Sequence, residues 1–238
     1  MTPEEMVSRL LYRDGLMLVI DKPSGFAVHR GPQSSNKGCE SLEDHFDALR
    51  FGLPRAPALA HRLDRDTSGC LVLGRHRKAL AQLGRLFKSG AIDKTYWAVV
   101  EGAPPADQGV IDLPLGRLDE RRGWWMKHDP NGQPAVTKWR VLGRNLGGKT
   151  AWLALDPISG RTHQLRVHCA EMGWPIVGDA IYGRAPRSGG PVLHLLAREV
   201  VVPLYKNRAP IRIIAPVPQH MHAALAACGW KADAKAAE

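Results

Sequence analysis

The chain alternates between short apolar runs and longer stretches in which apolar residues recur every three or four positions. Short runs that are rich in β-branched and aromatic residues and bounded by turn residues are typical of strands. They predict strands at residues 17–20, 71–73, 95–100, 136–142, 151–155, 192–202 and 211–214. The longer repeat, together with helix-start and helix-stop residues, indicates helices. These are expected at residues 41–49, 78–88, 162–172 and 219–227.

The order of these elements favours an α+β fold over a doubly wound parallel sheet. Strands outnumber helices and do not alternate regularly with them. Residues 109–131 contain many turn residues and are expected to form an excursion or long hairpin. Because neither an internal repeat nor a low-complexity linker divides the chain, a single domain is expected over residues 1–230. Residues 231–238 are expected to be a disordered tail.

The charge balance suits a polyanionic partner. The chain has 33 Lys and Arg against 23 Asp and Glu, which gives a net charge of +10. Neutralising phosphates releases counterions and favours binding, but a basic enzyme without such a partner would have the same composition. Charge alone therefore does not separate these two classes.

Metal sites, disulfides and membrane segments are not expected from the sequence. The 4 cysteines lie far apart without a C-x-x-C pair, which favours reduced thiols. His61, His163 and His168 lack zinc-site spacing. The first residues contain no signal-peptide core, and no apolar run approaches membrane-spanning length. We therefore expect a cytoplasmic protein.

The densest polar cluster is H-R-L-D-R-D-T-S-G at residues 61–69, directly before a predicted strand. Rigid loops at strand ends commonly carry function. Arg62 and Arg65 flank Asp64, and nearby cations favour the ionised carboxylate. Such a group can act as a nucleophile, a base or a stabiliser of a sugar cation. Turns rich in Asp, Ser and Gly are also common on surfaces, so the residues alone leave a solvated turn as the simpler interpretation.

Arg166 is expected in or near the first turn of the helix at residues 162–172. A cation there opposes the positive end of the helix macrodipole, which is unfavourable unless an anion lies close by. Asp64 or a phosphate would supply that anion; a solvated surface arginine is the alternative. The buried stripe of the same helix is expected to contain Leu165, Cys169 and Met172.

The cluster at residues 61–69 resembles the motif that holds the catalytic aspartate of the RluA-type pseudouridine synthases. Further segments resemble motifs of the same family, in the family's order. They are D-K-P-S-G at residues 21–25, K-T-Y at 94–96, G-R-T-H-Q-L-R-V-H at 160–168 and P-I-V-G-D at 175–179. These motifs are spread along the chain, so the resemblance covers residues 11–215.

The resemblance implies the pseudouridine synthase fold, a long mixed, mostly antiparallel sheet flanked by helices and loops with a central cleft. It implies an isomerase that converts uridines of ribosomal and/or transfer RNA to pseudouridine without a cofactor or metal. Asp64 would be the essential carboxylate, Tyr96 would pack against the base, and Arg166 would pair with Asp64. The expected RNA-binding residues are Arg62, Arg65, Arg161 and His163.

Other residues have two possible interpretations under this resemblance. Candidate outer RNA contacts, each of which is otherwise a solvated charge, are Arg121, Arg122, Arg184 and Arg187. Trp124 and Trp125 either stack on RNA or pack the hairpin.

Two features depart from the family pattern. Many members carry an N-terminal ribosomal-protein-like RNA-binding module, whereas only a short segment precedes the first predicted strand here. We therefore expect the catalytic domain itself to select the target. Leu195 follows His194 where a small alanine is expected, which affects local packing rather than chemistry.

Two other classes of function compete with the synthase. A non-catalytic RNA-binding protein on the same fold would need no carboxylate. A glycoside hydrolase would usually need two carboxylates that flank the bond, whereas Asp64 and Asp66 are near neighbours in the sequence. A monomer is the default expectation.

Overall fold

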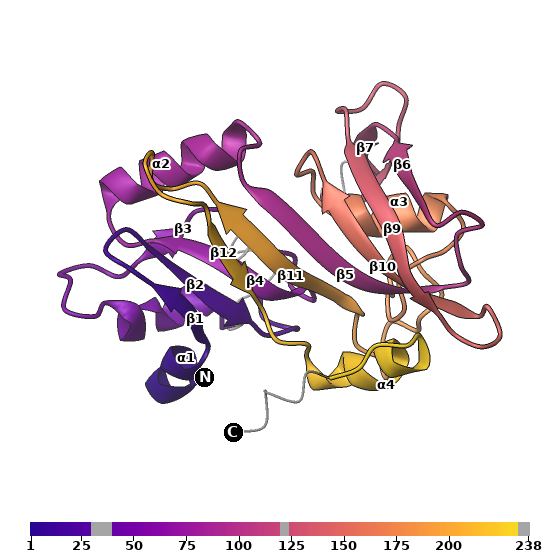
Figure 1. Ribbon diagram of the computed structural model, residues 1–238, viewed down its shortest axis with the longest axis horizontal. Coiled ribbons are helices and arrows are strands. Elements are labelled where there is room, and N and C mark those ends of the chain that lie inside the picture. Colours follow the sequence, from indigo (N-terminus) through magenta and orange to yellow (C-terminus); the bar gives the residue numbers. More distant parts are fainter. Residues whose placement is uncertain (30–39, 120–123, 233–238) are drawn as a thin grey trace. The chain divides into compact units, whose positions relative to one another are not determined.

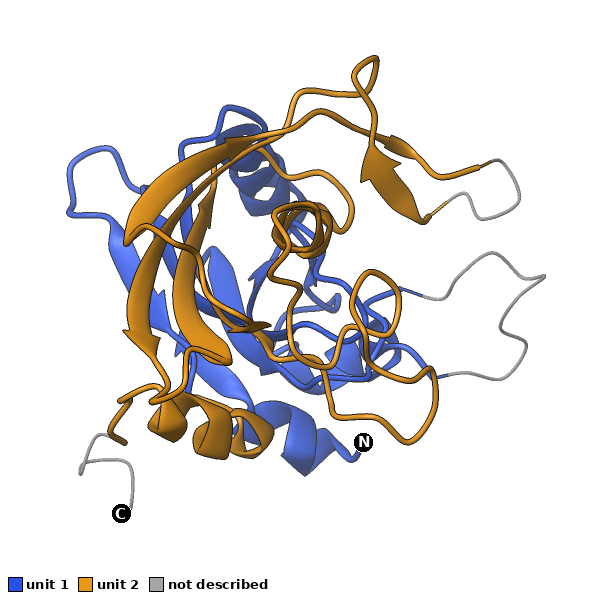
Figure 2. Ribbon diagram, turned by 90° about the vertical axis from the view of Figure 1, so that its right-hand side faces the viewer, with its two compact units in different colours: residues 1–95, 196–216 blue, residues 96–195, 217–238 orange. Residues whose placement is uncertain are grey.

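The computed structural model describes residues 1–29, 40–119 and 124–232. Most of the expected tail, residues 233–238, lies outside the described residues. The chain forms two compact units, coloured separately in Figure 2. Unit 1 contains residues 1–95 and 196–216, and unit 2 contains residues 96–195 and 217–238. The expected single domain over residues 1–230 stays a prediction.

Unit 1 is built around a fully buried strand. Its strands, labelled in Figure 1, are β1 (Leu10–Arg13), β2 (Met17–Lys22), β3 (Ala58–Leu59), β4 (Ser68–Gly74), β11 (Leu195–Val202, in unit 1 from Leu196 onward) and β12 (Ile211–Ile214). β4 pairs antiparallel with β2 and β3 and parallel with β11. All residues of β4 are buried, as its continuous apolar run predicts for a strand covered on both faces.

The helices of unit 1 are α1 (Pro3–Ser8), the 3-10 helix η1 (Leu42–Leu49) and α2 (Arg77–Lys88). The capping box predicted from Ser41 and Asp44 starts η1, although the helix is of the tighter 3-10 type. α1 was not predicted, although Thr2 and Glu5 form a capping box at its start. α2 matches its predicted position within one residue.

Unit 2 contains an antiparallel sheet in the order β5-β10-β9-β6. These strands are β5 (Asp93–Glu101, in unit 2 from Tyr96 onward), β6 (Gln108–Asp112), β9 (Val136–Arg144) and β10 (Thr150–Pro157). The excursion at residues 109–131 contains a small hairpin of β7 (Leu115–Arg117) and β8 (Met126–His128). The helices are α3 (Gln164–Glu171) and α4 (Gln219–Ala227). The stretch expected to be an excursion or long hairpin thus begins with a strand of the sheet, β6, and continues into a short hairpin.

The core of unit 2 lies between its sheet and α3. Ala98 and Leu153 of the sheet cluster with Leu165 and Cys169 of the helix. Leu195, where the resemblance predicts a smaller residue, is buried in the same cluster, so the core accommodates its larger side chain.

The expected buried stripe of this helix was wrong in one position. Met172 is exposed, because α3 ends at Glu171 and Met172 is its C-cap. The helix also starts at Gln164 rather than at residue 162, because His163 has a left-handed backbone conformation with φ +52°.

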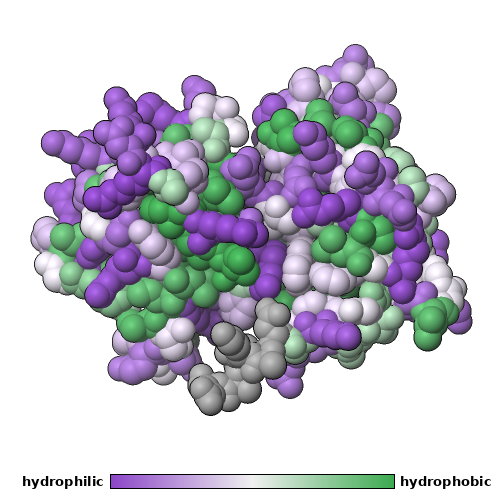
Figure 3. Space-filling model, in the orientation of Figure 1, coloured by the Kyte–Doolittle hydropathy of each residue, from purple (hydrophilic) through white to green (hydrophobic). Residues whose placement is uncertain are grey.

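The mixed, mostly antiparallel strands and the few helices confirm the predicted α+β fold. Hydrophilic and hydrophobic residues are interspersed on the face shown in Figure 3. Among the helices of the described residues, none is long and apolar enough to cross a membrane.

Candidate active site

The loop that carries Asp64 connects β3 to β4 in unit 1, and a buried lysine ties it down. Lys22, the last residue of β2, is 0% exposed. Its Nζ donates to the carbonyl oxygens of Pro23 at 2.9 Å, Arg65 at 2.7 Å and Thr67 at 2.8 Å. An ammonium has three N–H donors, so these carbonyls match its full hydrogen-bonding capacity. The loop backbone is therefore fixed from beneath.

Burial changes the acid–base behaviour of this lysine. It lowers the pKa of Lys22 to about 7, although the charges of Asp66 and Asp64 act in the opposite direction. The sequence contained Lys22 in the D-K-P-S-G motif, but no role was predicted for it. Its partners 43 and 45 residues away could not be identified from that motif.

A second set of contacts joins the same loop to the turn after β2. Ser24 Oγ donates to the carbonyl oxygen of Asp66 at 2.7 Å. Gly25 and Arg65 are joined twice: Gly25 N donates to Arg65 O, and Arg65 Nε donates to Gly25 O, both at 3.0 Å. Thr67 N donates to Asp64 O at 3.2 Å and closes the turn. The half-buried Asp64 therefore stands on a loop whose backbone is fixed before any ligand binds.

Gly69 shapes the junction of this loop with the sheet. It has φ +104°, and a Cβ there would lie 2.3 Å from the carbonyl oxygen of Ala197 on the paired strand β11. Real Cβ atoms do not approach a backbone oxygen so closely, so glycine is required on both grounds.

His61 supports the loop from its other end. Its Nε2 accepts a hydrogen bond from Val72 N at 3.0 Å, and its ring stacks on Phe87 with 4.4 Å between centroids. Burial, with a smaller effect of the Lys94 charge, lowers the pKa of His61 to about 3. His61 is thus a neutral structural side chain at physiological pH.

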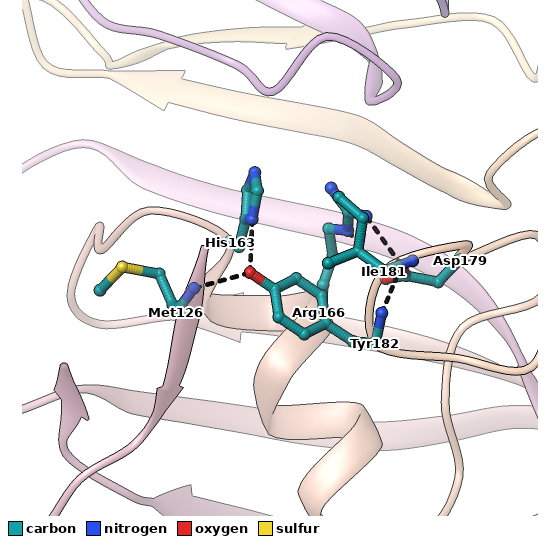
Figure 4. A network of polar contacts seen from close by, with 6 residues as sticks. All are labelled: Met126, His163, Arg166, Asp179, Ile181 and Tyr182. Carbon is teal, nitrogen blue, oxygen red and sulfur yellow. Dashed lines mark hydrogen bonds and ion pairs between the residues drawn. The ribbon is translucent and has the colours of Figure 1, made fainter. Parts of the chain in front are cut away.

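Arg166 lies in the first turn of α3 in unit 2 and is 4% exposed. Its Nε and Nη2 donate to the two carboxylate oxygens of Asp179 at 2.8 and 2.7 Å (Figure 4). Asp179 is 1% exposed, and its Oδ1 also accepts from the backbone N–H groups of Ile181 and Tyr182. Burial raises the pKa of Asp179, but Arg166 and these N–H groups outweigh it and lower the pKa overall.

Asp179 is therefore an anion of the kind that the helix-dipole argument requires near Arg166. Asp179 is the last residue of the P-I-V-G-D motif, but the sequence alone indicates Asp64 or a phosphate for this role. A buried bidentate arginine–carboxylate pair fixes the plane of the guanidinium.

Tyr182 joins this ion pair to the β7–β8 hairpin. Its hydroxyl accepts a hydrogen bond from Met126 N at 2.9 Å and lies 2.7 Å from Nδ1 of His163 (Figure 4). Its ring centroid lies 5.2 Å from Cζ of Arg166, within cation–π range. One side chain thus contacts the hairpin, the residue before α3 and the arginine itself. The sequence analysis did not single out Tyr182.

The remaining predicted residues have varied environments. Tyr96 is half-buried on β5, opposite Leu155 of β10 and against the unit 2 core. Arg62 is exposed in unit 1, and Arg161 is exposed in unit 2, where its Nε donates to Pro134 O at 3.1 Å. Each is placed within its own unit, so the convergence of Asp64, Tyr96 and Arg166 stays a prediction.

The outer candidates and histidines are also placed. Arg184 and Arg187 are exposed, whereas Arg121 and Arg122 lie outside the described residues. His168 is buried, with Nδ1 3.0 Å from the Thr137 hydroxyl and Nε2 3.1 Å from Leu113 O. That environment is typical of a satisfied core histidine.

The chain belongs to the RNA pseudouridylate synthase family, whose model matches residues 16–171. This places it among isomerases that act on RNA. It is 40% identical over 216 residues to a Zymomonas mobilis protein described as an uncharacterized RNA pseudouridine synthase, covering 90% of this chain and 95% of that one.

Two further comparisons extend this finding. The chain is 34% identical over 227 residues to ribosomal large subunit pseudouridine synthase C of Vibrio cholerae, covering 93% of this chain and 69% of that protein. The solved structure of human RNA Pseudouridylate Synthase Domain Containing 4 is similar with a TM-score of 0.78 at 26% identity, over 97% of this chain and 96% of that one. The comparisons confirm the predicted family, fold and isomerase class.

Proposed function

We propose that the chain isomerises specific uridines of ribosomal and/or transfer RNA to pseudouridine, with Asp64 as the catalytic carboxylate. The observation that carries the proposal is the construction beneath the Asp64 loop. Burying an ammonium is costly unless it is fully hydrogen-bonded, and Lys22 meets that condition with carbonyls that include two of the loop. Such construction is typical of a loop whose side chain must be held in position.

Asp64 acts on the sugar of the target nucleotide. Breaking the N-glycosidic bond leaves electron deficiency on the ribose and negative charge on the uracil. The carboxylate forms an adduct with the sugar or removes a proton from C2′; both routes are open. The base then rotates and carbon five bonds to C1′, which releases the carboxylate in the adduct route and is accompanied by return of the C2′ proton in the other. Carbon five then loses its proton, and the former glycosidic nitrogen gains one. One carboxylate suffices because the uracil stays bound and no water needs activation.

Arg166 and Tyr96 complete this proposed site. Asp179 binds Arg166 through Nε and Nη2 and so fixes its guanidinium. The pairing of Arg166 with Asp64 is what the resemblance to the family implies, and it forms part of this proposal. Tyr96 stacks on the target base, a contact worth roughly 1–3 kcal/mol in other nucleic-acid sites.

RNA binding follows from the charge of the chain and the exposed arginines. A uridine must leave its stack to expose the glycosidic bond, at a cost of a few kcal/mol. Arg62, Arg65 and Arg161 are exposed, and their contacts with phosphate would offset this cost. His163 is only 8% exposed, so its part in RNA binding is to hold neighbouring groups. A cytoplasmic location and a monomeric state belong to the same proposal.

The test compares two aspartates of one loop. Pseudouridines are mapped by carbodiimide modification in RNA from cells that lack the gene and are complemented with wild type, Asp64→Asn or Asp66→Asn. Asp66 is the matched control because it is a second carboxylate of the same loop. Its Oδ1 lies 3.9 Å from Nε of Arg65. We expect Asp64→Asn to abolish a specific subset of pseudouridines and Asp66→Asn to retain them, and the RNA that contains the subset identifies the target.

RNA binding by the purified proteins separates the alternatives. We expect both variants to bind RNA as tightly as wild type. Full activity of Asp64→Asn would reject the assignment of Asp64. A wild-type protein that binds RNA and forms no pseudouridine would favour the non-catalytic RNA-binding alternative.

A further inference from the structure

Trp124, which precedes β8, is 57% exposed. Among the large hydrophobic side chains that the described residues expose, it is the aromatic one; the others are aliphatic or methionine. A single exposed hydrophobic residue needs no explanation, so exposure alone carries no argument. What distinguishes Trp124 is that its ring is held in place while it remains accessible.

Two aromatic neighbours fix the orientation of this ring. The Trp124 centroid lies 5.6 Å from that of Trp125 at an interplanar angle of 78°. It also lies 5.6 Å from the ring of His163 at 87°. Both are edge-to-face contacts, the favourable arrangement for aromatic pairs. A large, pre-oriented aromatic surface therefore faces solvent beside the hairpin.

His163 is itself held by an unusual backbone and a firm hydrogen bond. Its φ of +52° is uncommon for a residue with a Cβ and is mildly strained. As the N-cap of α3, it makes no side-chain capping bond. Its ring lies against the Tyr182 hydroxyl at 2.7 Å and against Trp124 instead. Backbone strain of this kind clusters at functional sites.

A cation lies next to the same aromatic pair. Cζ of the exposed Arg187 is 5.2 Å from the centroid of the Trp125 ring. A guanidinium stacked on an aromatic ring keeps its outward N–H groups available to a phosphate. An aromatic face beside a cation is the combination with which proteins bind single-stranded nucleic acid.

We infer that Trp124, held by Trp125 and His163, stacks on an unpaired nucleobase of the RNA, and that Arg187 binds an adjoining phosphate. This inference rests on the proposed function, because that function supplies RNA as the ligand. His163 stands three residues before Arg166, and Tyr182 contacts both. The stacked nucleotide therefore lies beside the Arg166 end of α3.

The test uses two single-stranded probes of equal length: an oligouridylate and an abasic oligomer with the same ribose-phosphate backbone. We expect Trp124→Ala to weaken binding of the oligouridylate about 5- to 150-fold and to leave binding of the abasic oligomer unchanged. Trp124→Phe retains an aromatic face and should fall between wild type and Trp124→Ala. Leu146→Ala, which removes a fully exposed side chain elsewhere in unit 2, is the control and should match wild type.

Arg187→Gln tests the phosphate contact separately. It should weaken both probes and reduce the slope of log binding constant against log salt by about one. Thermal unfolding of each variant shows whether the fold is intact.

Several outcomes would overturn the inference. Unchanged oligouridylate binding by Trp124→Ala would do so, and so would an equal loss on both probes. Asp64→Asn assayed in parallel separates this result from the proposed function. Base-dependent binding through Trp124 without pseudouridine formation by wild type would sustain the stacking site and reject the catalytic proposal. Pseudouridine formation by wild type without base-dependent binding through Trp124 would reject only the stacking site.

Discussion

Arg166 and Asp179 form a bidentate ion pair that is almost completely buried within unit 2. A buried pair of this kind adds little net stability, because desolvation of both charges offsets their attraction. Its consequence is geometric, since the fork of the carboxylate fixes the plane of the guanidinium. The guanidinium of Arg166, in the motif at residues 160–168, is thus oriented by Asp179, in the motif at residues 175–179.

Replacing one partner of this pair should be strongly destabilising. We expect Asp179→Asn to lower the free energy of unfolding by about 3–5 kcal/mol, because Arg166 would remain buried without its counter-charge. Urea denaturation measures the change. The double variant Arg166→Met with Asp179→Leu serves as the comparison, since it removes both charges and should recover much of the stability. If the ion pair matters only for folding, the double variant would also recover activity, whereas we expect it to stay inactive.

Tyr182 offers two variants that separate its hydroxyl from its ring. Tyr182→Phe removes the contacts with Met126 N and His163 but keeps the ring near Arg166. We expect a higher KM for RNA with kcat nearly unchanged. Tyr182→Leu also removes the cation–π contact, worth about 0.5–2 kcal/mol, and should lower kcat as well.

Steady-state kinetics on the mapped RNA substrate measures this difference. Tyr205→Phe is the matched control, because the Tyr205 hydroxyl donates to Asp14 in unit 1. It should leave both constants unchanged. Identical kinetic effects of Tyr182→Phe and Tyr182→Leu would contradict separate roles for the hydroxyl and the ring.

Lys22 should make stability depend on pH in the alkaline range. Its pKa is about 7 in the folded chain and has an ordinary value near 10.5 when unfolded. The unfolded state therefore binds more protons between these values, so the contribution of Lys22 to stability rises from pH 7 to about 10.5. Its burial penalty is fully present below pH 7. The slope should approach about 1.4 kcal/mol per pH unit.

The measurement is urea denaturation at intervals between pH 7 and 10. Lys22→Met should lose this slope, and it should also lower activity because Pro23, Arg65 and Thr67 lose their shared donor. Lys78→Met, which changes an exposed lysine of α2, should keep the wild-type slope. A wild-type stability that is flat across this range would contradict the lowered pKa of Lys22.

Gly69→Ala should damage the base of the Asp64 loop. The new Cβ would collide with Ala197 O, and the φ of +104° is unfavourable for alanine. We expect a loss of about 2–4 kcal/mol of stability, together with reduced activity. Gly15→Ala has open space around its Cβ position and should change stability by less than about 1 kcal/mol. Equal effects of the two substitutions in thermal unfolding would contradict this interpretation.

Local pattern predicted most of the secondary structure because the strands and α2 are marked by their own apolar spacing. The continuous run of β4 and the alternation in β9 and β10 need no distant information. The start of α3 was misplaced because the conformation of His163 is accompanied by contacts with Tyr182 and Trp124, which adjacent residues do not reveal. The resemblance supplied the family, whereas physics alone left a solvated turn as the simpler interpretation of residues 61–69.

The partners of the predicted residues were the part that the sequence could not supply. Lys22 and Asp179 stand in recognised motifs, yet their roles depend on hydrogen bonds that cross 43 residues in one case and 13 in the other. Trp124 left two alternatives open, and the structure favours a ligand-facing role by showing it exposed and held by neighbours.

The contacts of Lys22 have a consequence for how such a chain can vary over evolutionary time. The ammonium anchors the Asp64 loop directly to the end of β2, across 43 and 45 residues of the chain. A substitution of Lys22 should therefore be tolerated only together with changes in the loop, because either change alone leaves a buried polar group without its partner.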